Sequence, residues 1–298
     1  MDAAQEPEVD MIVVAGASGR TGGVVAETLL AAGKKVRALV RNPARGEPWR
    51  GRGAEVAVAS LADQTALERA LTGASALFTL LPEDPAVPEF HAYRRRMADA
   101  TASAVARTGV PHVVFLSAVA AAFETESGPA ADLHHAEKAL RAAGGRVTVL
   151  RACYLQENVL SALPAARGQG MYPNFLPSAD VVFPTIATRD IGRLAARYLA
   201  EPPDESETID LLGPAYSVRQ MAAALGAAFG VELRLVDIPA SQHVDAFVGF
   251  GMPREMAEAV AEMFACFAAG RVVPKGDRSV RVTTTIEEVI RQALRGLR

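Results

Sequence analysis

The amino-acid sequence predicts an α/β fold, in which helices cover both faces of a doubly wound parallel sheet and a smaller C-terminal α/β domain follows. The first observation behind this prediction is that short apolar runs alternate with helix-length segments through the first half of the chain. The second is that these runs are nearly continuous and rich in β-branched residues, which is typical of parallel strands buried on both faces. The third is that glycines follow several helical segments, at positions where helices commonly end.

The strands and helices of the first half follow from this alternation. Apolar runs predict strands over Met11–Ala15, Lys35–Val40, Glu55–Ala59, Ala76–Leu81, His112–Ser117 and Arg146–Leu150. Helical periodicity lies near Gly22–Ala32, Asp63–Leu71, Glu89–Thr108 and Asp132–Ala143. We expect Asp63 to cap its helix, with contact to an adenine as the alternative. Right-handed crossovers bring the carboxyl ends of the strands to one edge of the sheet, where ligands bind in this class of fold.

The second half of the chain is organised differently, because the alternation stops after Arg151. Residues Leu163–Pro184 contain prolines and glycines without helical periodicity, so we expect a long irregular connection that covers a ligand. A helix is expected over Ser217–Phe229, a strand over Val231–Ile238 and a helix over Met252–Ala269. One stripe of the last helix consists of Met256, Val260, Met263, Phe264 and Phe267. The stripe packs in a core or, alternatively, forms a flexible apolar wall of a pocket.

Three glycines directly after the first expected strand are the strongest functional signal. Gly16, Gly19 and Gly22 follow this strand, and a helical pattern begins at once. Such a turn lets the backbone approach a pyrophosphate, whose charge is held by the helix N-terminus. Strand, turn and helix in this order indicate a Rossmann fold with a bound dinucleotide rather than an ordinary structural turn. The binding residues expected in the turn are Gly16, Ser18, Gly19, Arg20, Thr21 and Gly22.

The end of the second strand favours NADP(H) over NAD. Arg41 stands where NAD-binding folds usually place an acidic residue for the ribose 2′-hydroxyl. A guanidinium binds a 2′-phosphate, and Arg20 in the glycine turn can reach the same phosphate. Surface roles are the alternatives for both arginines. Thr79, Leu80 and Leu81, at the end of the fourth strand, are expected to line the nicotinamide ribose.

Composition excludes several other classes of function. A net charge of -3 gives no electrostatic case for nucleic acid, and the basic run Arg94–Arg96 is expected to be a solvated helix face. The two cysteines, Cys153 and Cys266, lack metal-ligand spacing, so we expect no metal and no disulfide. No apolar run reaches the ~20 residues of a membrane span. We expect a cytoplasmic monomer or homodimer that takes a small-molecule substrate.

These features also suggest a division of the chain. Residues 1–10 are expected to be a disordered tail and residues 11–155 the NADP(H)-binding Rossmann domain. Residues 156–298 are expected to form a smaller substrate or cleft domain, part of which, about 185–212, returns to the Rossmann sheet.

Several short motifs occur at intervals along the chain. They are Gly16–Gly22, Val36–Pro43, Val113–Ser117, Glu137–Gly144, Thr148–Arg151, Glu157–Asn158 and Asp190–Gly192. Together they resemble the NmrA-like, atypical short-chain dehydrogenase/reductase family. The resemblance covers most of the chain, is strongest over residues 11–160, and implies an NADP(H)-binding Rossmann domain with a small C-terminal domain forming a cleft. Members of that family include quinone reductases, phenylpropanoid-type reductases and redox-sensing regulators.

The sequence lacks the usual proton-transfer residues of such enzymes. None of its four lysines lies four residues after a tyrosine, so the Tyr-x-x-x-Lys pair is absent. Many NmrA-like enzymes carry a lysine four residues before the glutamate matching Glu137, but Leu133 stands here. The candidates that remain are Ser117, at the end of the fifth strand, and His134 and His135, for which exposed polar roles are the alternative. Tyr154 and Asn158 are expected to face the cleft and contact substrate, unless they make ordinary loop contacts.

Together these observations predict an NADPH-dependent reductase that transfers hydride to a quinone or similar small electrophile. A quinone accepts hydride without a strong proton donor, so proximity and orientation can supply most of the catalysis. The alternative is an NADP(H)-binding redox sensor without turnover. A third class, a non-redox isomerase or epimerase, requires a residue that abstracts a proton from the substrate, and no such residue can be identified from the sequence.

Overall fold

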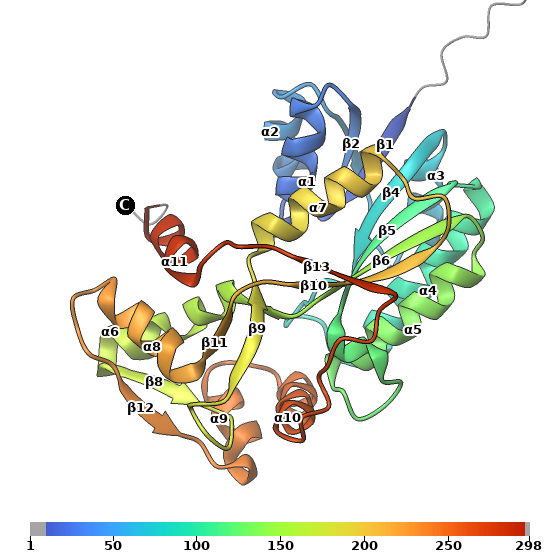
Figure 1. Cartoon of the computed structure of the whole chain (residues 1–298). Helices are drawn as coiled ribbons and strands as arrows, with labels where there is room; N and C mark the ends of the chain where they lie inside the picture. Colours follow the sequence, from blue (N-terminus) through green and yellow to red (C-terminus); the bar gives the residue numbers. More distant parts are fainter. Residues whose placement is uncertain (1–9, 296–298) are drawn as a thin grey trace, which may run out of the picture.

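The computed structural model describes residues 10–295, and its centre is an eight-stranded parallel sheet (Figure 1). The strand order β13-β10-β6-β5-β4-β1-β2-β3 confirms the doubly wound α/β prediction. The six strands predicted for the first half are confirmed, with ends that shift by at most two residues. Only Asp10 of the expected tail lies within the described residues. The strands of the sheet are β1 (Met11–Ala15), β2 (Lys35–Val40), β3 (Glu55–Val58), β4 (Ala74–Leu80), β5 (His112–Ala118), β6 (Arg146–Ala152), β10 (Glu207–Leu212) and β13 (Arg278–Arg281).

Two apolar layers hold helices on the two faces of the sheet (Figure 1). One face is covered by α1 (Arg20–Ala31), α2 (Glu47–Arg50) and α7 (Thr188–Ala200). The other is covered by α3 (Gln64–Leu71), α4 (Phe90–Thr108) and α5 (Pro129–Ala142). Asp63 caps α3 as expected, because its Oδ1 accepts a 2.9 Å hydrogen bond from the Ala66 amide.

A close contact between α1 and α7 fixes the helix behind the glycine turn. A Cβ at Gly192 would lie 2.6 Å from Val24 Cβ and 3.0 Å from the Thr21 carbonyl oxygen. Glycine is therefore required for this helix pair to approach so closely. The contact holds the first two turns of α1, whose N-terminus faces the expected nucleotide site.

A smaller unit lies beyond the carboxyl edge of the sheet (Figure 1). It contains a three-stranded sheet in the order β11-β9-β7 and a two-stranded sheet of β12 and β8. The strands are β7 (Tyr154–Leu155), β8 (Met171–Asn174), β9 (Val182–Ile186), β11 (Ala215–Ser217) and β12 (Arg234–Asp237). Its helices are α6 (Leu163–Gln169), α8 (Val218–Ala227), α9 (His243–Gly249), α10 (Arg254–Ala268) and α11 (Ile286–Arg295).

The interpretation of Leu163–Pro184 as a long irregular connection was wrong. This segment contains α6, β8 and the start of β9. Its prolines permit these elements, because Pro164 lies in the first turn of α6, where its missing N–H costs no helical hydrogen bond. Pro173 lies in the two-stranded sheet, where one side of the strand has no partner.

Other side chains also depart from the expected pattern. Arg94 is not part of a solvated face, because its side chain is 3% exposed, whereas Arg95 and Arg96 are exposed. For the apolar stripe of the helix expected over Met252–Ala269, core packing is confirmed at Met256, which is buried against Phe90. Phe264 and Phe267, from the same stripe, pack on the core of the smaller unit.

Membrane-spanning helices and metal-type clusters can be assessed only over residues 10–295. Over that range, no helix combines the length and apolar character needed to cross a bilayer. Within the same residues, no cluster of three potential metal-ligating side chains occurs. Cys153 and Cys266 are both buried free thiols.

Candidate functional site

The turn between β1 and α1 has a shape that only glycine permits. Gly16 has a φ of +66°, and a Cβ there would lie 2.9 Å from Leu80 Cδ2. A Cβ at Gly22 would lie only 2.3 Å from the Gly16 carbonyl oxygen. The Gly19 amide donates a 2.8 Å hydrogen bond to that oxygen and closes the turn. The turn therefore lies close to the end of β4.

The N-terminus of α1 is free to bind an anion. Its N-cap residue is Gly19, which has no side chain to cap the helix, and the first turn contains no acidic residue. Ser18, Gly19 and Arg20 are exposed, whereas Thr21 is buried. Unpaired N–H groups and the helix dipole favour a phosphate at such a position. The turn thus fits a dinucleotide pyrophosphate, both in backbone shape and in charge.

Arg41, directly after β2, is paired with an acidic residue that sequence reasoning missed. Its Nη1 lies 2.5 Å from Asp84 Oδ2, in the loop that follows β4. Their contact lowers the pKa of Asp84 and raises the pKa of Arg41. The pair thus joins the expected 2′-phosphate residue to the loop after Thr79–Leu81. Nothing in the sequence marks Asp84, which is 43 residues from Arg41.

The end of β4 is anchored by a buried arginine. Thr79 is buried and Leu80 contacts the glycine turn, while the Leu81 carbonyl accepts a 3.0 Å hydrogen bond from Arg94 Nη1. Arg94 Nε also lies 3.2 Å from Asp132 Oδ2, a carboxylate that is 0% exposed. The sequence held one signal for this role, because Arg94 is spaced by helical periodicity from buried residues of α4.

Ser117 belongs to a buried polar network. Its hydroxyl donates a 2.5 Å hydrogen bond to Glu137 Oε1, and the serine is 3% exposed. Arg151 donates to both carboxylate oxygens of Glu137, at 3.0 and 2.6 Å. The network connects β5, α5 and β6 at the carboxyl edge of the sheet. Since Ser117 already has a partner, its contact with a substrate stays a prediction.

The two neighbouring histidines lie in different surroundings. His134 Nδ1 lies 2.9 Å from the Ala121 carbonyl oxygen, in the 3-10 helix η2 (Val119–Ala122) that follows β5. A carbonyl only accepts, so Nδ1 carries the hydrogen and Nε2 is left for proton exchange. His135 Nε2 instead pairs with Asp99 of α4 at 2.6 Å, and both side chains are exposed. The geometry favours His134 over His135 as a candidate proton donor.

Aromatic side chains surround the chain that leaves β6. The Tyr154 ring packs edge-on against Phe183 and Phe267, with ring centroids 5.3 and 6.3 Å away. Burial raises the pKa of Tyr154 to about 12, although a hydrogen bond with the Asn158 side chain opposes this shift. The Tyr154 hydroxyl therefore stays protonated. The structure brings Tyr154 and Asn158 together, while Asn158 itself is exposed.

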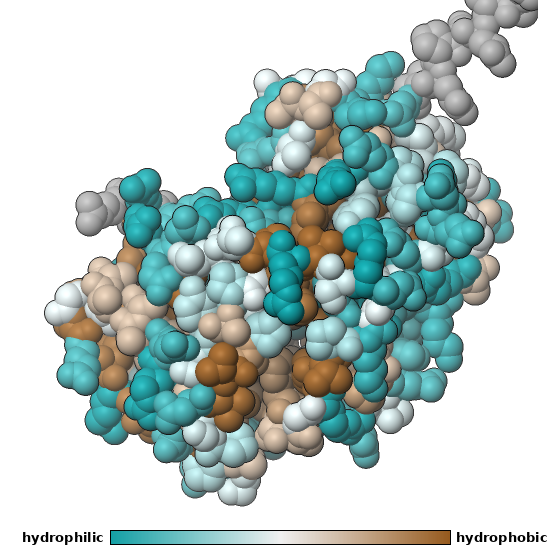
Figure 2. Space-filling model, viewed as in Figure 1, coloured by the Kyte–Doolittle hydropathy of each residue, from teal (hydrophilic) through white to brown (hydrophobic). Residues whose placement is uncertain are grey.

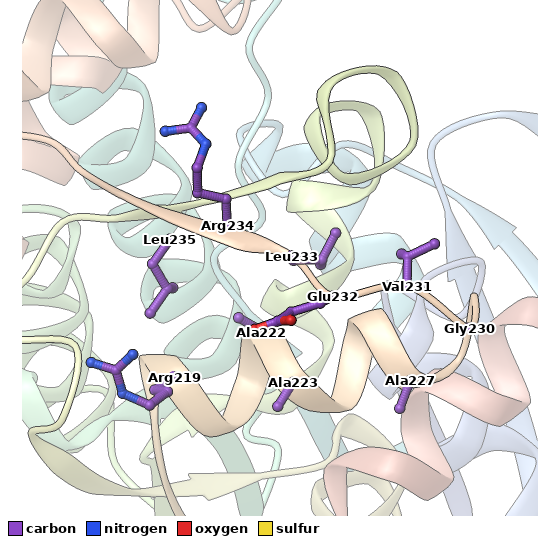
Figure 3. Close-up of a pocket in the computed structure, with 10 residues that line it drawn as sticks. All are labelled: Arg219, Ala222, Ala223, Ala227, Gly230, Val231, Glu232, Leu233, Arg234 and Leu235. Atoms are coloured by element: carbon purple, nitrogen blue, oxygen red, sulfur yellow. The ribbon is translucent and has the colours of Figure 1, made fainter.

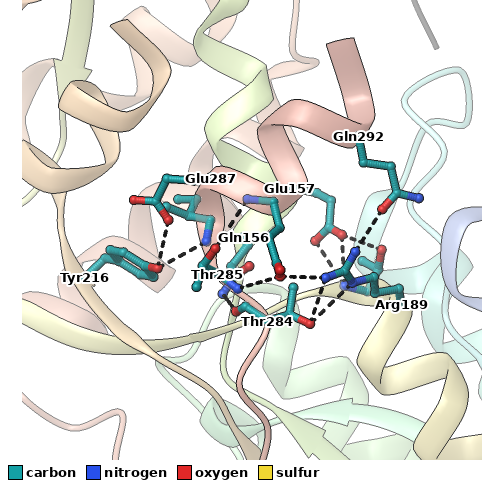
Figure 4. A network of polar contacts seen from close by, with 11 residues as sticks. Gln156, Glu157, Arg189, Tyr216, Thr284, Thr285, Glu287 and Gln292 are labelled. Atoms are coloured by element: carbon teal, nitrogen blue, oxygen red, sulfur yellow. Dashed lines mark hydrogen bonds and ion pairs between the residues drawn. The ribbon is translucent and has the colours of Figure 1, made fainter. Parts of the chain in front are cut away.

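A polar network fixes this segment against the C-terminal helix (Figure 4). Gln156 donates hydrogen bonds to the Thr284 carbonyl at 2.8 Å and to Thr185 Oγ1 at 3.1 Å. The Glu157 carboxylate accepts from the Thr188 amide at 2.9 Å and so caps the N-terminus of α7. Arg189 joins α7 to α11 through Glu288 at 2.7 Å. The residues next to Tyr154 are therefore held both by α7, which covers the large sheet, and by segments of the smaller unit.

A surface groove on the smaller unit lies away from these residues (Figure 3). It has a volume of about 510 Å³ between α8 and the chain leading into β12, and its lining includes Ala222, Ala227 and Leu235. None of the expected site residues lines it. Arg219, at its rim, is already bound by Asp180 at 2.7 Å. We therefore place the candidate site at the carboxyl edge of the large sheet.

Comparison with known proteins gives consistent matches over nearly the whole chain. The NmrA-like family model matches residues 8–297. An NAD(P)H azoreductase from Xenophilus azovorans is 30% identical over 256 residues, which cover 86% of each chain. Quinone oxidoreductase 2 from Escherichia coli is 29% identical over 85% of this chain and 86% of that protein. The crystal structure of an NADPH-dependent quinone oxidoreductase from Escherichia coli matches with a TM-score of 0.75 at 25% identity, covering 95% of this chain and 100% of that one.

Proposed function

This chain belongs to the NmrA-like family, and on that premise we propose that it is an NADPH-dependent reductase that transfers hydride to a quinone or a similar planar electrophile. The observation that carries the proposal is the uncapped glycine turn beside Leu80, with Arg41 at the end of the neighbouring strand. The names of the relatives support the reaction class, because they are quinone and azo reductases.

The residues at the sheet edge fit each part of NADPH. The amides at the start of α1 would hold the pyrophosphate, and Arg41 with Arg20 would hold the 2′-phosphate. Thr79, Leu80 and Leu81 would line the nicotinamide ribose. Bound NADPH supplies the hydride, whereas every other contribution comes from the protein.

Positioning is the main task left to the side chains. The aromatic group of Tyr154, Phe183 and Phe267 offers ring faces and edges against which a planar acceptor can pack. Holding such an acceptor beside the cofactor converts a bimolecular step into an intramolecular one. An acceptor packed against these partly buried rings would lose part of its contact with water.

Proton delivery to the reduced acceptor requires only a modest donor. We assign this role to His134, because the Ala121 carbonyl fixes the Nδ1 hydrogen and leaves Nε2 to hold and release a proton. Ser117 would act through the Glu137–Arg151 network, which keeps α5 and His134 in register with the strand ends. Leu133 stands where many NmrA-like enzymes carry a lysine, so no lysine at that position assists the proton transfer.

The test is the oxidation of NADPH, followed by its absorbance, with a benzoquinone, a naphthoquinone and an azo dye. We expect turnover with at least one acceptor, a roughly tenfold loss in H134Q, and a smaller loss in H135Q. Calorimetry of NADPH and NADP+ runs in parallel. Tight nucleotide binding without turnover across the panel would contradict the reductase and favour a redox sensor. The domain boundary at 155/156, the cytoplasmic location and the monomeric or dimeric state stay predictions.

A further inference from the structure

The Arg41–Asp84 ion pair crosses the edge of the sheet at which a dinucleotide would lie. Arg41 follows β2 and Asp84 follows β4, and β1 lies between these two strands in the sheet. Neighbouring strands are about 4.8 Å apart, so the two strand ends are about 10 Å apart. The pair, with 2.5 Å between Nη1 and Oδ2, therefore bridges the carboxyl end of β1, where the glycine turn begins.

Asp84 is held in place for this contact. Its second oxygen, Oδ1, accepts a 3.2 Å hydrogen bond from the Ala86 amide, and its side chain is 21% exposed. Arg41 is more open, with 55% of its side chain exposed, and Tyr93 of α4 is its other polar neighbour. The fixed partner is thus the carboxylate, whereas the guanidinium is the partner that can turn toward solvent or a ligand.

A 2′-phosphate competes with this carboxylate for the same cation. A guanidinium binds carboxylates and phosphates through the same N–H groups, so Arg41 cannot offer its full set to both. The negative charge of the Asp84 carboxylate also repels a phosphate dianion bound to Arg41. The ribose 2′-hydroxyl of NADH is uncharged, so it is not repelled by Asp84 and does not depend on an ion pair with Arg41.

We propose that Asp84 is a specificity-determining residue, an internal competitor for Arg41 that limits how strongly the protein prefers NADPH to NADH. The inference rests on the nucleotide site proposed above but not on turnover. It assigns opposite effects to two residues in direct contact. Arg41 raises the preference for a 2′-phosphate, and Asp84 lowers it.

Equilibrium binding without an acceptor tests this inference. The ligands are NADPH, NADH, adenosine 2′,5′-bisphosphate and AMP, titrated by calorimetry into the parent, D84N, D84E and E83Q. Glu83 is exposed and adjacent, so E83Q removes the same charge from the same loop. We expect D84N to bind NADPH and the bisphosphate about fivefold more tightly, the scale of a partly exposed ion pair. NADH and AMP should change less than about twofold, and D84E and E83Q should keep the preference of the parent.

The same titrations can overturn the inference. If D84N weakens NADPH binding, or shifts NADPH and NADH equally, then Asp84 positions Arg41 rather than competing for it. R41A should lower the preference for NADPH, and D84N added to R41A should tighten NADPH binding less than D84N does in the parent. A parent that binds neither nucleotide would overturn this inference together with the proposed function. A parent that binds nucleotide without turnover leaves this inference to be decided by D84N alone.

Discussion

The buried ion pair between Arg94 and Asp132 gives a prediction whose size follows from the structure. Asp132 is 0% exposed and is approached by His91 Nδ1 at 2.8 Å, Arg94 Nε at 3.2 Å and Arg95 Nε at 3.3 Å. Only Arg94 among these three is itself buried, at 3% exposure. In D132N, the guanidinium stays in a low-dielectric site without its counter-charge. We therefore expect D132N to lower the free energy of unfolding by about 3–5 kcal/mol.

Urea and thermal unfolding measure this loss. For a chain of this size, each kcal/mol corresponds to about 2–4 °C, so the midpoint should fall by roughly 10 °C. The matched control is R96M, on the exposed side of the same basic run, which should change stability by less than about 0.5 kcal/mol. The double variant R94M/D132L removes both charges and should recover most of the stability, since apolar replacements of buried pairs are often neutral.

The same pair also reaches the candidate site, because Arg94 holds the Leu81 carbonyl at the end of β4. D132N should therefore weaken NADPH binding as well as stability, while R96M should leave both unchanged. A loss of less than about 1 kcal/mol in D132N would refute the reasoning, because it would mean that solvent or a neighbouring group compensates Arg94.

Three further predictions concern the turn, the sheet and the aromatic group. A Cβ at Gly22 would lie 2.3 Å from the Gly16 carbonyl oxygen, so G22A should weaken NADPH binding at least about thirtyfold by calorimetry; an unchanged affinity would show that the turn does not bind the nucleotide. Burial lowers the pKa of His112 from 6.5 to about 4, so the neutral ring is favoured in the folded state and its contribution is complete above pH 6.5. Stability should fall by up to about 3 kcal/mol as the pH drops from 6.5 toward 4, and urea unfolding of H112Q should show a flatter pH dependence than the parent. Y154A should raise the KM for a planar acceptor about fivefold without changing NADPH affinity, whereas Y154F should retain the parent KM; equal effects of both variants would indicate that the hydroxyl, and not the ring, is what matters.

Much of the large sheet could be predicted from the sequence, because its signals are local. The six strands of the first half lie in runs dominated by apolar residues, and the helices between them carry their own periodicity. The edge strand β13, with the sequence RSVR, has no such signal. The glycine turn is also local, since the clash at Gly22 involves Gly16, six residues away. Function at the turn therefore follows from a short stretch of sequence.

The remaining site residues depend on partners that are distant in the chain. Arg94 looked like surface charge because Asp132, which compensates it, lies 38 residues away. Asp84 can be recognised as a site residue only from its contact with Arg41, which lies across the intervening strand β1. Ser117 looked like a free hydroxyl at a strand end, but Glu137 of the following helix already accepts its hydrogen. Pairings of this kind follow from topology and not from residue patterns.

The position of β13 has a consequence for how the chain reaches its folded state in the cell. This strand pairs in parallel with β10 and completes one edge of the large sheet, although α8, β12, α9 and α10 lie between the two strands in the chain. During synthesis, β1 to β6 and β10 leave the ribosome before β13 does, so the outer edge of β10 stays unpaired until β13 has been made. An open strand edge invites pairing with other chains. Because synthesis is vectorial, this edge of the large sheet closes only after the strands and helices between β10 and β13 have been made.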